Sequence, residues 1–195
     1  MNKTILSTAL VASLMALPAA SFAGETGSWF IGAQTGQSKL LQMTASHGTD
    51  TGYAISGGYR WIVNPAIDVG AEVGYANLGS FSDGFYSPGY ATPGKVTAKV
   101  KGAFAGANMR FFFNRNWYVL AQTGYFNAHS KINTRLGTYY DSMKTTKSSW
   151  YSGIGVGYRF DNNTSLGFVF NHFDDRTGQY DLASSLASVR LEVEF

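Results

Sequence analysis

The sequence predicts an all-β protein, an eight-stranded antiparallel up-and-down barrel that crosses a membrane. Apolar side chains recur at every second position in eight separate segments, and short connections alternate with long ones between these segments. No apolar stretch of 18 or more residues follows Ala23, which excludes a membrane-spanning helix there. A closed β-barrel is the other structure that satisfies every backbone hydrogen bond within lipid, so we interpret the alternating segments as its strands.

The first 23 residues have the pattern of a secretory signal peptide. Lys3 precedes an apolar run over residues 5–17. The small residues Ser21 and Ala23 occupy the third and the first position before the expected cleavage point. The apolar run is too short for a bilayer whose hydrocarbon core is about 30 Å thick. We therefore predict a signal peptide over 1–23, cleavage after Ala23 and one barrel domain over 24–195.

Composition excludes several classes of function. The chain has no Cys and therefore no disulfide, no thiol nucleophile and no Cys-ligated zinc site. Taking away Lys3 leaves 14 Lys and Arg residues against 12 Asp and Glu, a balance that does not indicate a nucleic acid partner. His47 and His129 stand apart without metal-ligand spacing, and no Gly-rich stretch links a strand to a helix, so we expect neither a metal nor a cofactor.

The first four predicted strands each have an apolar face and a face of small or polar residues. The apolar positions are Trp29, Ile31 and Ala33, then Tyr53, Ile55, Tyr59 and Trp61, then Ile67, Val69, Ala71, Val73 and Tyr75, and then Ala103, Ala105, Ala107, Met109, Phe111 and Phe113. Asn64-Pro65 predicts a tight turn between the second and third strands, which explains why the third begins abruptly.

The last four predicted strands follow the same rule. Their apolar face carries Trp117, Val119, Ala121 and Tyr125, then Ser152, Ile154, Val156, Tyr158 and Phe160, then Leu166, Phe168 and Phe170, and then Val189, Leu191, Val193 and Phe195. Phe126 and the residues around Tyr118 blur the alternation of the fifth strand, so its two faces could be exchanged. Aromatic residues gather at both ends of the outward faces, which predicts two interfacial girdles.

The connections give a second, independent signal. Three are short, at Asn64, Asn114 and Asp161, whereas four are long and polar. The long connections cover residues 39–51, 79–95, 130–147 and 174–183. Short periplasmic turns and long external loops are typical of outer-membrane barrels, and an even number of strands places both ends of the domain on the periplasmic side.

A soluble lipocalin-like barrel or a sandwich is the alternative that alternation leaves open. In such a protein the polar face meets water and is rich in Lys, Glu and Asp. Here that face is mostly Gly, Ser, Asn and Gln, which suit a crowded lumen. We therefore predict the membrane barrel.

The C-terminal segment has alternate apolar residues and ends on Phe195. It resembles the signal read by the outer-membrane barrel assembly machinery, so Phe195 is the expected contact with that partner. Together with the eight strands and the rhythm of connections, it makes the chain resemble the small barrel family that includes OmpX, Ail, Opa and the membrane domain of OmpA. The resemblance implies an integral outer-membrane protein without enzymatic activity, whose external loops stabilise the envelope or bind a surface ligand as an adhesin does.

Eight charged residues fall on predicted inward positions, four of each sign. They are Arg60, Asp68, Glu72, Arg110, Arg159, Arg190, Glu192 and Glu194. Eight strands enclose only enough room for side chains, so we expect these charges to neutralise one another in a hydrogen-bonded plug. The alternative is a narrow gated pore, which requires the plug to rearrange.

Basic residues gather near the predicted external rim. They are Lys95, Lys99, Lys101, Lys131, Arg135, Lys144 and Lys147. Cations at this height can bind lipopolysaccharide phosphates, so the expected partners are outer-membrane lipids and lipopolysaccharide, and also a host surface or another envelope component. The plainer interpretation is that these side chains reach the headgroup layer and stay solvated.

A lipid A-modifying enzyme is a further alternative. His172 is predicted on the outward face of the seventh strand near the external rim, Asp174 lies two positions on, and Ser185 is expected opposite. These are the residue types of acyl transfer, in which His takes the serine proton and a carboxylate orients the His. The lipid A deacylase barrels have Ser two residues after the His, where this chain has Asp174, so the sequence predicts no enzymatic activity.

Overall fold

The computed structural model describes residues 27–40, 49–87, 92–136, 139–160, 163–174, 176–177, 180–181 and 183–195. The predicted signal peptide and its cleavage after Ala23 lie outside these residues and stay predictions. Within the described ranges, no helix is long and apolar enough to cross a membrane.

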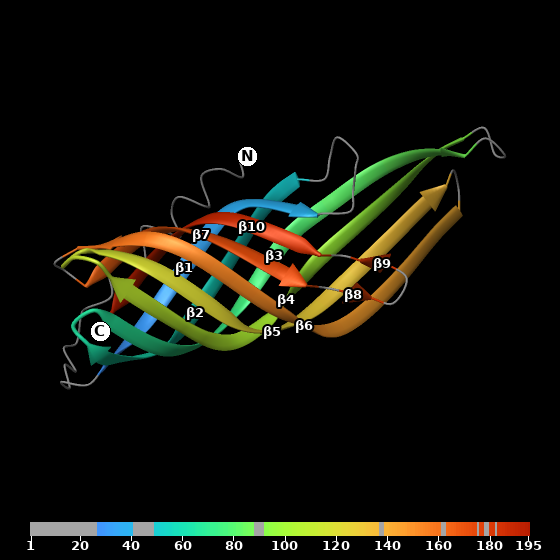
Figure 1. Cartoon of the computed structure of the whole chain (residues 1–195). Helices are drawn as coiled ribbons and strands as arrows, with labels where there is room; N and C mark the ends of the chain where they lie inside the picture. The colour runs from blue at the N-terminus through green and yellow to red at the C-terminus, as the bar shows by residue number, and fades with distance from the viewer. Residues whose placement is uncertain are drawn as a thin grey trace.

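Eight strands form a closed barrel in which every strand is antiparallel to both neighbours (Figure 1). They are β1 (Gly27–Leu40), β2 (Thr49–Asn64), β3 (Ile67–Ser87), β4 (Thr92–Phe112), β5 (Trp117–Leu136), β6 (Tyr139–Arg159), β7 (Thr164–Asp174) and β10 (Ser184–Glu194). β1 pairs with β10 and closes the ring. The short strands β8 (Arg176–Thr177) and β9 (Tyr180–Asp181) form a separate two-stranded sheet. The predicted fold class is confirmed.

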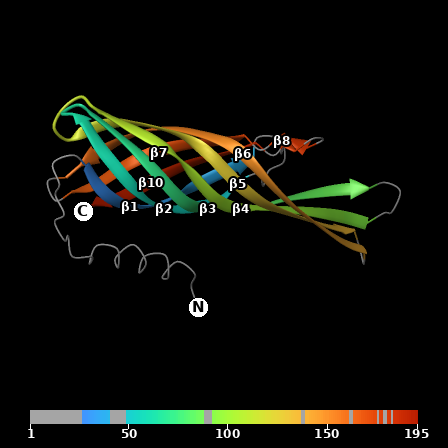
Figure 2. The ribbon, with the colours of Figure 1, turned by 90° about the horizontal axis from the view of Figure 1, so that it is seen from below.

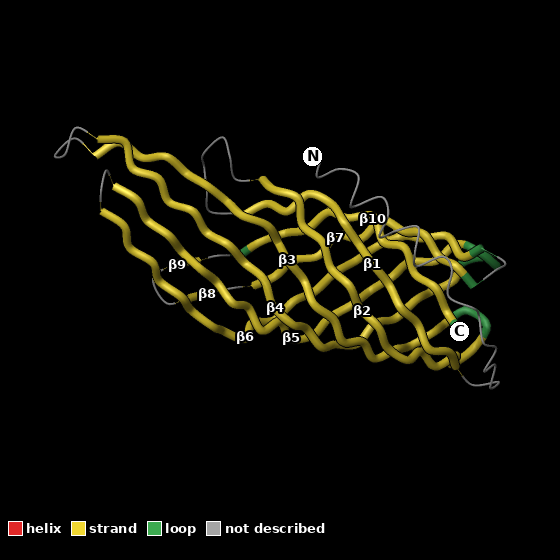
Figure 3. Tube along the Cα trace, turned by 180° about the vertical axis from the view of Figure 1, so that it is seen from behind, coloured by secondary structure: helices red, strands yellow, loops and turns green. Residues whose placement is uncertain are grey.

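The short turns lie together at one end of the barrel (Figure 3). The Asn64 Oδ1 atom accepts a 2.9 Å hydrogen bond from the backbone N–H of Ala66. The Asn114 Oδ1 atom accepts bonds of 3.0 and 2.8 Å from the backbone N–H groups of Asn116 and Trp117. Asn side chains that bind the backbone in this way stabilise tight turns, which explains why Asn stands at both reversals.

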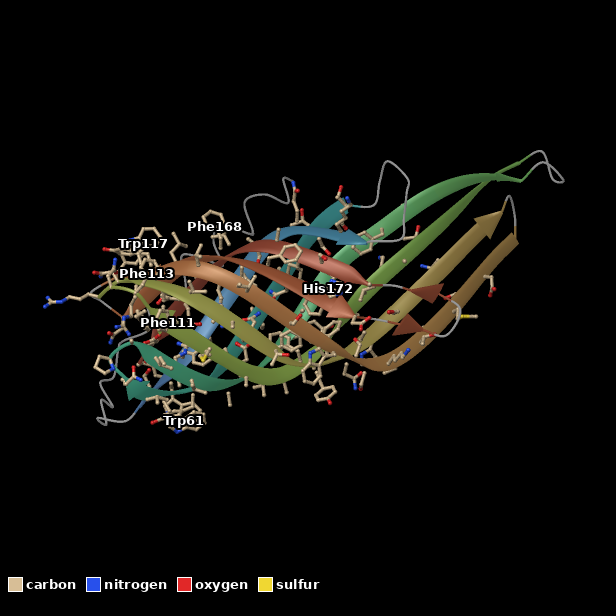
Figure 4. All side chains as sticks on the ribbon, in the orientation of Figure 1. Trp61, Phe111, Phe113, Trp117, Phe168 and His172 are labelled. Atoms are coloured by element: carbon tan, nitrogen blue, oxygen red, sulfur yellow. The ribbon has the colours of Figure 1, made fainter. Side chains whose placement is uncertain are left out.

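The two faces of the strands follow the predicted alternation. In β5, Trp117 and Tyr125 are exposed on the outer wall, whereas Tyr118 and Phe126 are buried in the lumen, so the faces of this strand are not exchanged. Aromatic side chains of one predicted girdle lie at the end with the short turns, where Figure 4 labels Trp61, Phe111, Phe113 and Trp117.

The loops predicted at 79–95 and 130–147 are wrong, because both segments are mostly strand. β3 pairs with β4 as far as Ser87, β5 pairs with β6 as far as Leu136, and β4 and β5 stay paired between them. About 9–11 residues suffice for a strand to span a membrane, whereas β3 to β6 have 20 or 21 each. Four strands therefore continue past the others as one sheet (Figures 1 and 2). We call this sheet the wing: residues 79–87, 92–100, 130–136 and 139–145.

A β-bulge in β3 lies at the base of the wing. The register between β3 and β4 shifts between Asn77 and Gly79, and Gly79 has a φ of +97°. The Asn77 Oδ1 atom accepts a 3.0 Å bond from the Gly79 N–H, and Asp50 Oδ2 accepts a 2.6 Å bond from the Ser80 N–H. The extra residue exchanges the two faces of β3, so Phe81 points inward and is fully buried. This change of phase hid the strand from a search for simple alternation.

Candidate functional site

A network of buried charges lies in the half of the lumen nearer the short turns, beside a small apolar cluster of Phe112, Tyr118, Leu120 and Val169. Its centre is Glu192 of β10, whose Oε1 atom accepts a 2.7 Å bond from Arg60 Nη1 and also contacts Arg110 Nη2. The Glu192 Oε2 atom lies 2.9 Å from Arg190 Nη2. All four side chains are buried. One carboxylate therefore joins guanidinium groups from β2, β4 and β10.

Two further carboxylates balance these three arginines. Glu194 Oε1 accepts bonds of 2.8 Å from Arg60 Nη1 and 2.5 Å from Arg110 Nη1. Glu72 Oε2 of β3 accepts a 3.1 Å bond from Arg190 Nη2. Buried charges cost free energy unless they are paired and hydrogen-bonded. Three arginines meet three glutamates here, so the connected network has no net charge.

Neutral side chains extend the network around the lumen. Gln122 of β5 accepts a 3.0 Å bond from Arg190 Nη1, and its amide nitrogen donates a 2.5 Å bond to Asn171 Oδ1 of β7. The hydroxyl of Tyr151 on β6 donates a 3.2 Å bond to Glu72 Oε1. The hydrogen bonds and ion pairs of the network thus link β2, β3, β4, β5, β6, β7 and β10 across the interior.

The other two predicted lumen charges lie at the margin of the network. Arg159 Nη1 is 3.9 Å from Asp68 Oδ2, and the Arg159 side chain is one-third exposed. Its guanidinium carbon lies 4.3 Å from the ring centre of Phe112, within the range of a cation–π interaction. The structure places all eight predicted charges inside the barrel and joins six of them directly.

The external half of the lumen is filled by apolar side chains, which the sequence analysis missed. The cluster consists of Ala54, Ala76, Leu78, Val100, Phe104, Phe126, Ala128, Tyr151, Phe173 and Leu186. The rings of Phe126 and Phe173 are 4.9 Å apart, and Tyr151 stacks on Phe173 at 5.8 Å. Phe104 and Phe126 occupy inward positions of their strands, and they were the signal in the sequence that could have predicted this cluster. Aromatic residues on the outward faces of the same strands made that signal hard to recognise.

Three predicted basic residues form a row on the outer wall. Lys99 of β4 pairs in register with Lys131 of β5, which pairs in turn with Lys144 of β6. We call these three residues the lysine row. One step nearer the membrane, Lys101 pairs with His129, and both are exposed.

The remaining predicted basic residues do not belong to the lysine row. Lys147 pairs with the buried Ala128 and shares its face of the sheet, opposite to the face of the lysine row. The side chains of Lys95 and Arg135 lie outside the described part of the structure.

His172 and Ser185 come together on the outer wall. They pair in register between β7 and β10, and His172 Nδ1 lies 3.4 Å from Ser185 Oγ. Asp174 lies two positions further along β7, opposite Trp150. Figure 4 shows His172 far from the end with the short turns. The register therefore places three residue types of acyl transfer at the external end of neighbouring strands.

Residues 8–195 match the family model of the outer membrane protein beta-barrel domain. The chain belongs to this family. It is an integral protein of the outer membrane, and its short turns and long hairpins match the periplasmic and external sides of such barrels. No curated protein sequence matches the chain.

Solved outer-membrane proteins share the fold of this family member. Ail of Yersinia pestis is 16% identical, with a TM-score of 0.52 over 87% of this chain and 98% of Ail. For Ail in complex with the heparin analogue sucrose octasulfate, the sequence identity is 15% and the TM-score is 0.50 over the same shares of the two chains. For the outer membrane enzyme PagL, the sequence identity is 13% and the TM-score is 0.47, over 84% of this chain and 98% of the PagL chain. Likeness at these identities concerns the fold alone.

Aromatic girdles locate the membrane interfaces of such barrels. At the external end, the exposed rings of Tyr125 and Trp150 lie 4.9 Å apart, and Tyr75 is exposed nearby on β3. Tyr75 pairs with Ala103, and Lys101 precedes Ala103 by two residues on β4, nearer the external end. The lysine row, beyond Lys101, is therefore at the height of lipid headgroups.

Proposed function

We propose that this outer-membrane barrel is a surface-binding protein without enzymatic activity and that the wing is its binding element. The observation that supports this proposal most strongly is a four-stranded sheet with two open edges that continues past the other barrel strands. Pairing of β2 with β3 ends at Asn77, and pairing of β6 with β7 ends at Trp150. Past these points, no described strand pairs with the outer edge of β3 or of β6.

An open edge presents a row of unpaired backbone N–H and C=O groups, which can take up a strand from another chain. The side chains of Asp141, Ser142 and Met143 along the β6 edge are exposed. The strands that carry these edges continue from the closed barrel below. These features support an extended segment of a host or envelope surface protein as the ligand.

Trimming the wing tests this function. Asn133 pairs with Ser142, and Asp83 pairs with Val96, so residues 134–141 and 84–95 can each be replaced by Asn-Gly, which closes a two-residue hairpin. We expect the trimmed protein to keep the heat-dependent gel mobility of a folded barrel and to lose adhesion of producing cells to host or envelope surfaces. A matched variant shortened between β7 and β10 should adhere normally. Normal adhesion by the trimmed protein would overturn the proposal.

The barrel assembly machinery is a second proposed partner. Phe195 and Trp29 exchange backbone hydrogen bonds of 3.0 and 2.9 Å beside the seam of β1 and β10, so a terminal signal would lie where the barrel closes. We expect Phe195→Ser to lower the amount of assembled protein in the outer membrane, and Phe160→Ser to lower it less. Equal amounts from Phe195→Ser and the unmodified chain would contradict this role.

A gated pore is an alternative function, and the packing of the lumen argues against it. Arg60, Arg110, Phe126 and Leu186 are at most 1% exposed, so water does not reach these central side chains of either half. We expect single-channel recordings of the purified protein, and of Arg110→Ala, to show no steady conductance, because the apolar half stays closed. Stepwise conductance of the unmodified protein would establish the pore.

A lipid A-modifying enzyme is favoured by one observation, the 3.4 Å contact between His172 Nδ1 and Ser185 Oγ. A neutral imidazole at this position can accept the serine proton. Purified protein is incubated with lipid A, and acyl chains are followed by mass spectrometry. We expect no loss of an acyl chain. A loss that disappears in Ser185→Ala would establish the enzyme and overturn the non-enzymatic proposal.

A further inference from the structure

We propose that the outer wall formed by β3, β4, β5 and β6 binds one molecule of lipopolysaccharide, with the lysine row on its lipid A phosphates and an acyl chain in a groove below. This site lies on the outward face of the sheet where the wing begins, and it is distinct from ligand binding by the edges of the wing.

The lysine row is the first observation. Neighbouring strands lie about 4.8 Å apart, so the backbones of Lys99, Lys131 and Lys144 span about 10 Å. Like charges directly opposite one another destabilise a sheet. Among the described residues, none of the three lysines forms an ion pair with a carboxylate. An anion between them removes this repulsion.

A cavity of about 440 Å³ beside the row is the second observation. Its lining includes Lys99, Lys101, His129, Lys131 and Asp50. Both carboxylate oxygens of Asp50 already accept backbone hydrogen bonds, of 2.7 Å from Thr51 and 2.6 Å from Ser80. Asp50 therefore holds the bulge, and Lys99, Lys101 and Lys131 leave the cavity cationic. Phosphate oxygens accept charge-assisted hydrogen bonds from such groups.

A shallow groove lies next to this cavity on the side of the membrane centre, because the Ala103 and Asn127 pair in its lining is two residues from the Lys101 and His129 pair of the cavity. It has a volume of about 550 Å³, and its lining includes Val73, Ala103, Ala105 and Tyr125. The row below it is small as well, because Ala71 and Thr123 both pair with Ala107. By contrast, β7 carries the exposed rings of Phe168 and Phe170 on the outer wall.

The cavity and the groove together select the ligand. Inorganic phosphate would use the cavity and leave the apolar groove empty, whereas a phosphorylated lipid fills both. A phospholipid with a single headgroup phosphate, such as phosphatidylglycerol, offers one phosphate to a row about 10 Å wide. Lipid A carries two phosphates on one glycolipid headgroup and several acyl chains, so it can contact the row at more than one point.

The test compares two triple variants with the same change of charge. In K99Q/K131Q/K144Q the lysine row is neutral, and in K39Q/R115Q/K147Q three cations elsewhere are removed. Native mass spectrometry of purified protein titrated with lipid A measures binding. We expect one lipid A per barrel, about a hundredfold weaker binding by the row variant, and a change of no more than about twofold in the control. Equal weakening in both variants would overturn the site. Heat-dependent gel mobility reports folding, and K99R/K131R/K144R should restore binding.

Further binding measurements distinguish lipid A from other phosphate-containing ligands. Ala105→Phe fills the groove, leaves the lysines intact and should weaken lipid A binding about tenfold. Fully dephosphorylated lipid A should bind as weakly as lipid A does to the row variant. Equal binding of dephosphorylated lipid A, of dimyristoyl phosphatidylglycerol or of inorganic phosphate would each overturn the assignment to lipid A. The protein with a trimmed wing keeps all three lysines, so it should lose adhesion and retain lipid A.

Discussion

The two halves of the lumen differ in the side chains that dominate them, although the same strands supply both. Nearer the periplasm, Arg60, Arg110 and Arg190 surround Glu192, whereas apolar side chains around Phe126 fill the external half. Buried ion pairs require defined geometry, because each unpaired charge is costly. Apolar contacts are non-directional and depend on the area buried. We infer that the charged half specifies which strands meet, and that the apolar half supplies packing.

The largest effect should follow from Glu192→Gln. The substitution removes the one carboxylate that contacts three guanidinium groups and leaves buried positive charge without compensation. Breaking a buried pair in this way costs about 3–5 kcal/mol. Urea unfolding in lipid vesicles, followed by Trp fluorescence, measures the loss of unfolding free energy. Arg115→Gln in the exposed turn is the control and should cost less than about 0.5 kcal/mol. A loss below about 1 kcal/mol for Glu192→Gln would contradict the comparison.

A slightly smaller effect is expected for Leu186→Ala in the apolar half. Leu186 is fully buried, so truncation leaves a cavity and costs about 2–4 kcal/mol. Leu166→Ala is the matched control on the neighbouring strand, because Leu166 is exposed on the outer wall. The same urea titration compares them. Equal losses for the two variants would mean that the external half is not tightly packed.

Much of the barrel could be predicted from the sequence, because alternation and turn residues act locally. Asn64 and Asn114 fix two reversals through their own side chains, and the alternation then assigns inward and outward residues. The wing could not be predicted in this way. The bulge before Gly79 shifts the phase of β3, and the Gly, Pro and Ser residues that follow have the composition of a loop.

The candidate sites also have a part that the sequence predicts and a part that depends on the pairing of distant strands. Inward charges could be chosen residue by residue, but the partners of Glu192 depend on how strands far apart in sequence meet across the lumen. The register of Lys131 with Lys144 depends on β5 and β6 continuing as a hairpin, where the sequence suggested a long loop. The lysine row therefore became visible only in the structure.

Tyr151 joins the two halves, and Tyr151→Phe tests that junction. Its ring packs on Phe104 and Phe173, and its hydroxyl donates a hydrogen bond to Glu72. Loss of the hydroxyl keeps the packing and removes one bond to a carboxylate, so we expect a loss of about 1–2 kcal/mol in unfolding free energy. Tyr125→Phe on the outer wall should change little. A double-mutant cycle with Glu72→Gln should show coupling, and additive losses would place Tyr151 in the apolar half alone.

The smallest effect should come from Asp68→Asn, which tests whether the charged half is uniform. Asp68 faces Arg159 at 3.9 Å, and the Arg159 side chain is one-third exposed, so water already solvates this guanidinium group. Ion pairs with an exposed partner contribute about 0–1 kcal/mol, and we expect a loss within that range in the same urea titration. Arg159→Gln should cost equally little. A loss as large as that of Glu192→Gln would mean that the charges act as one unit rather than as a buried centre with a solvated margin.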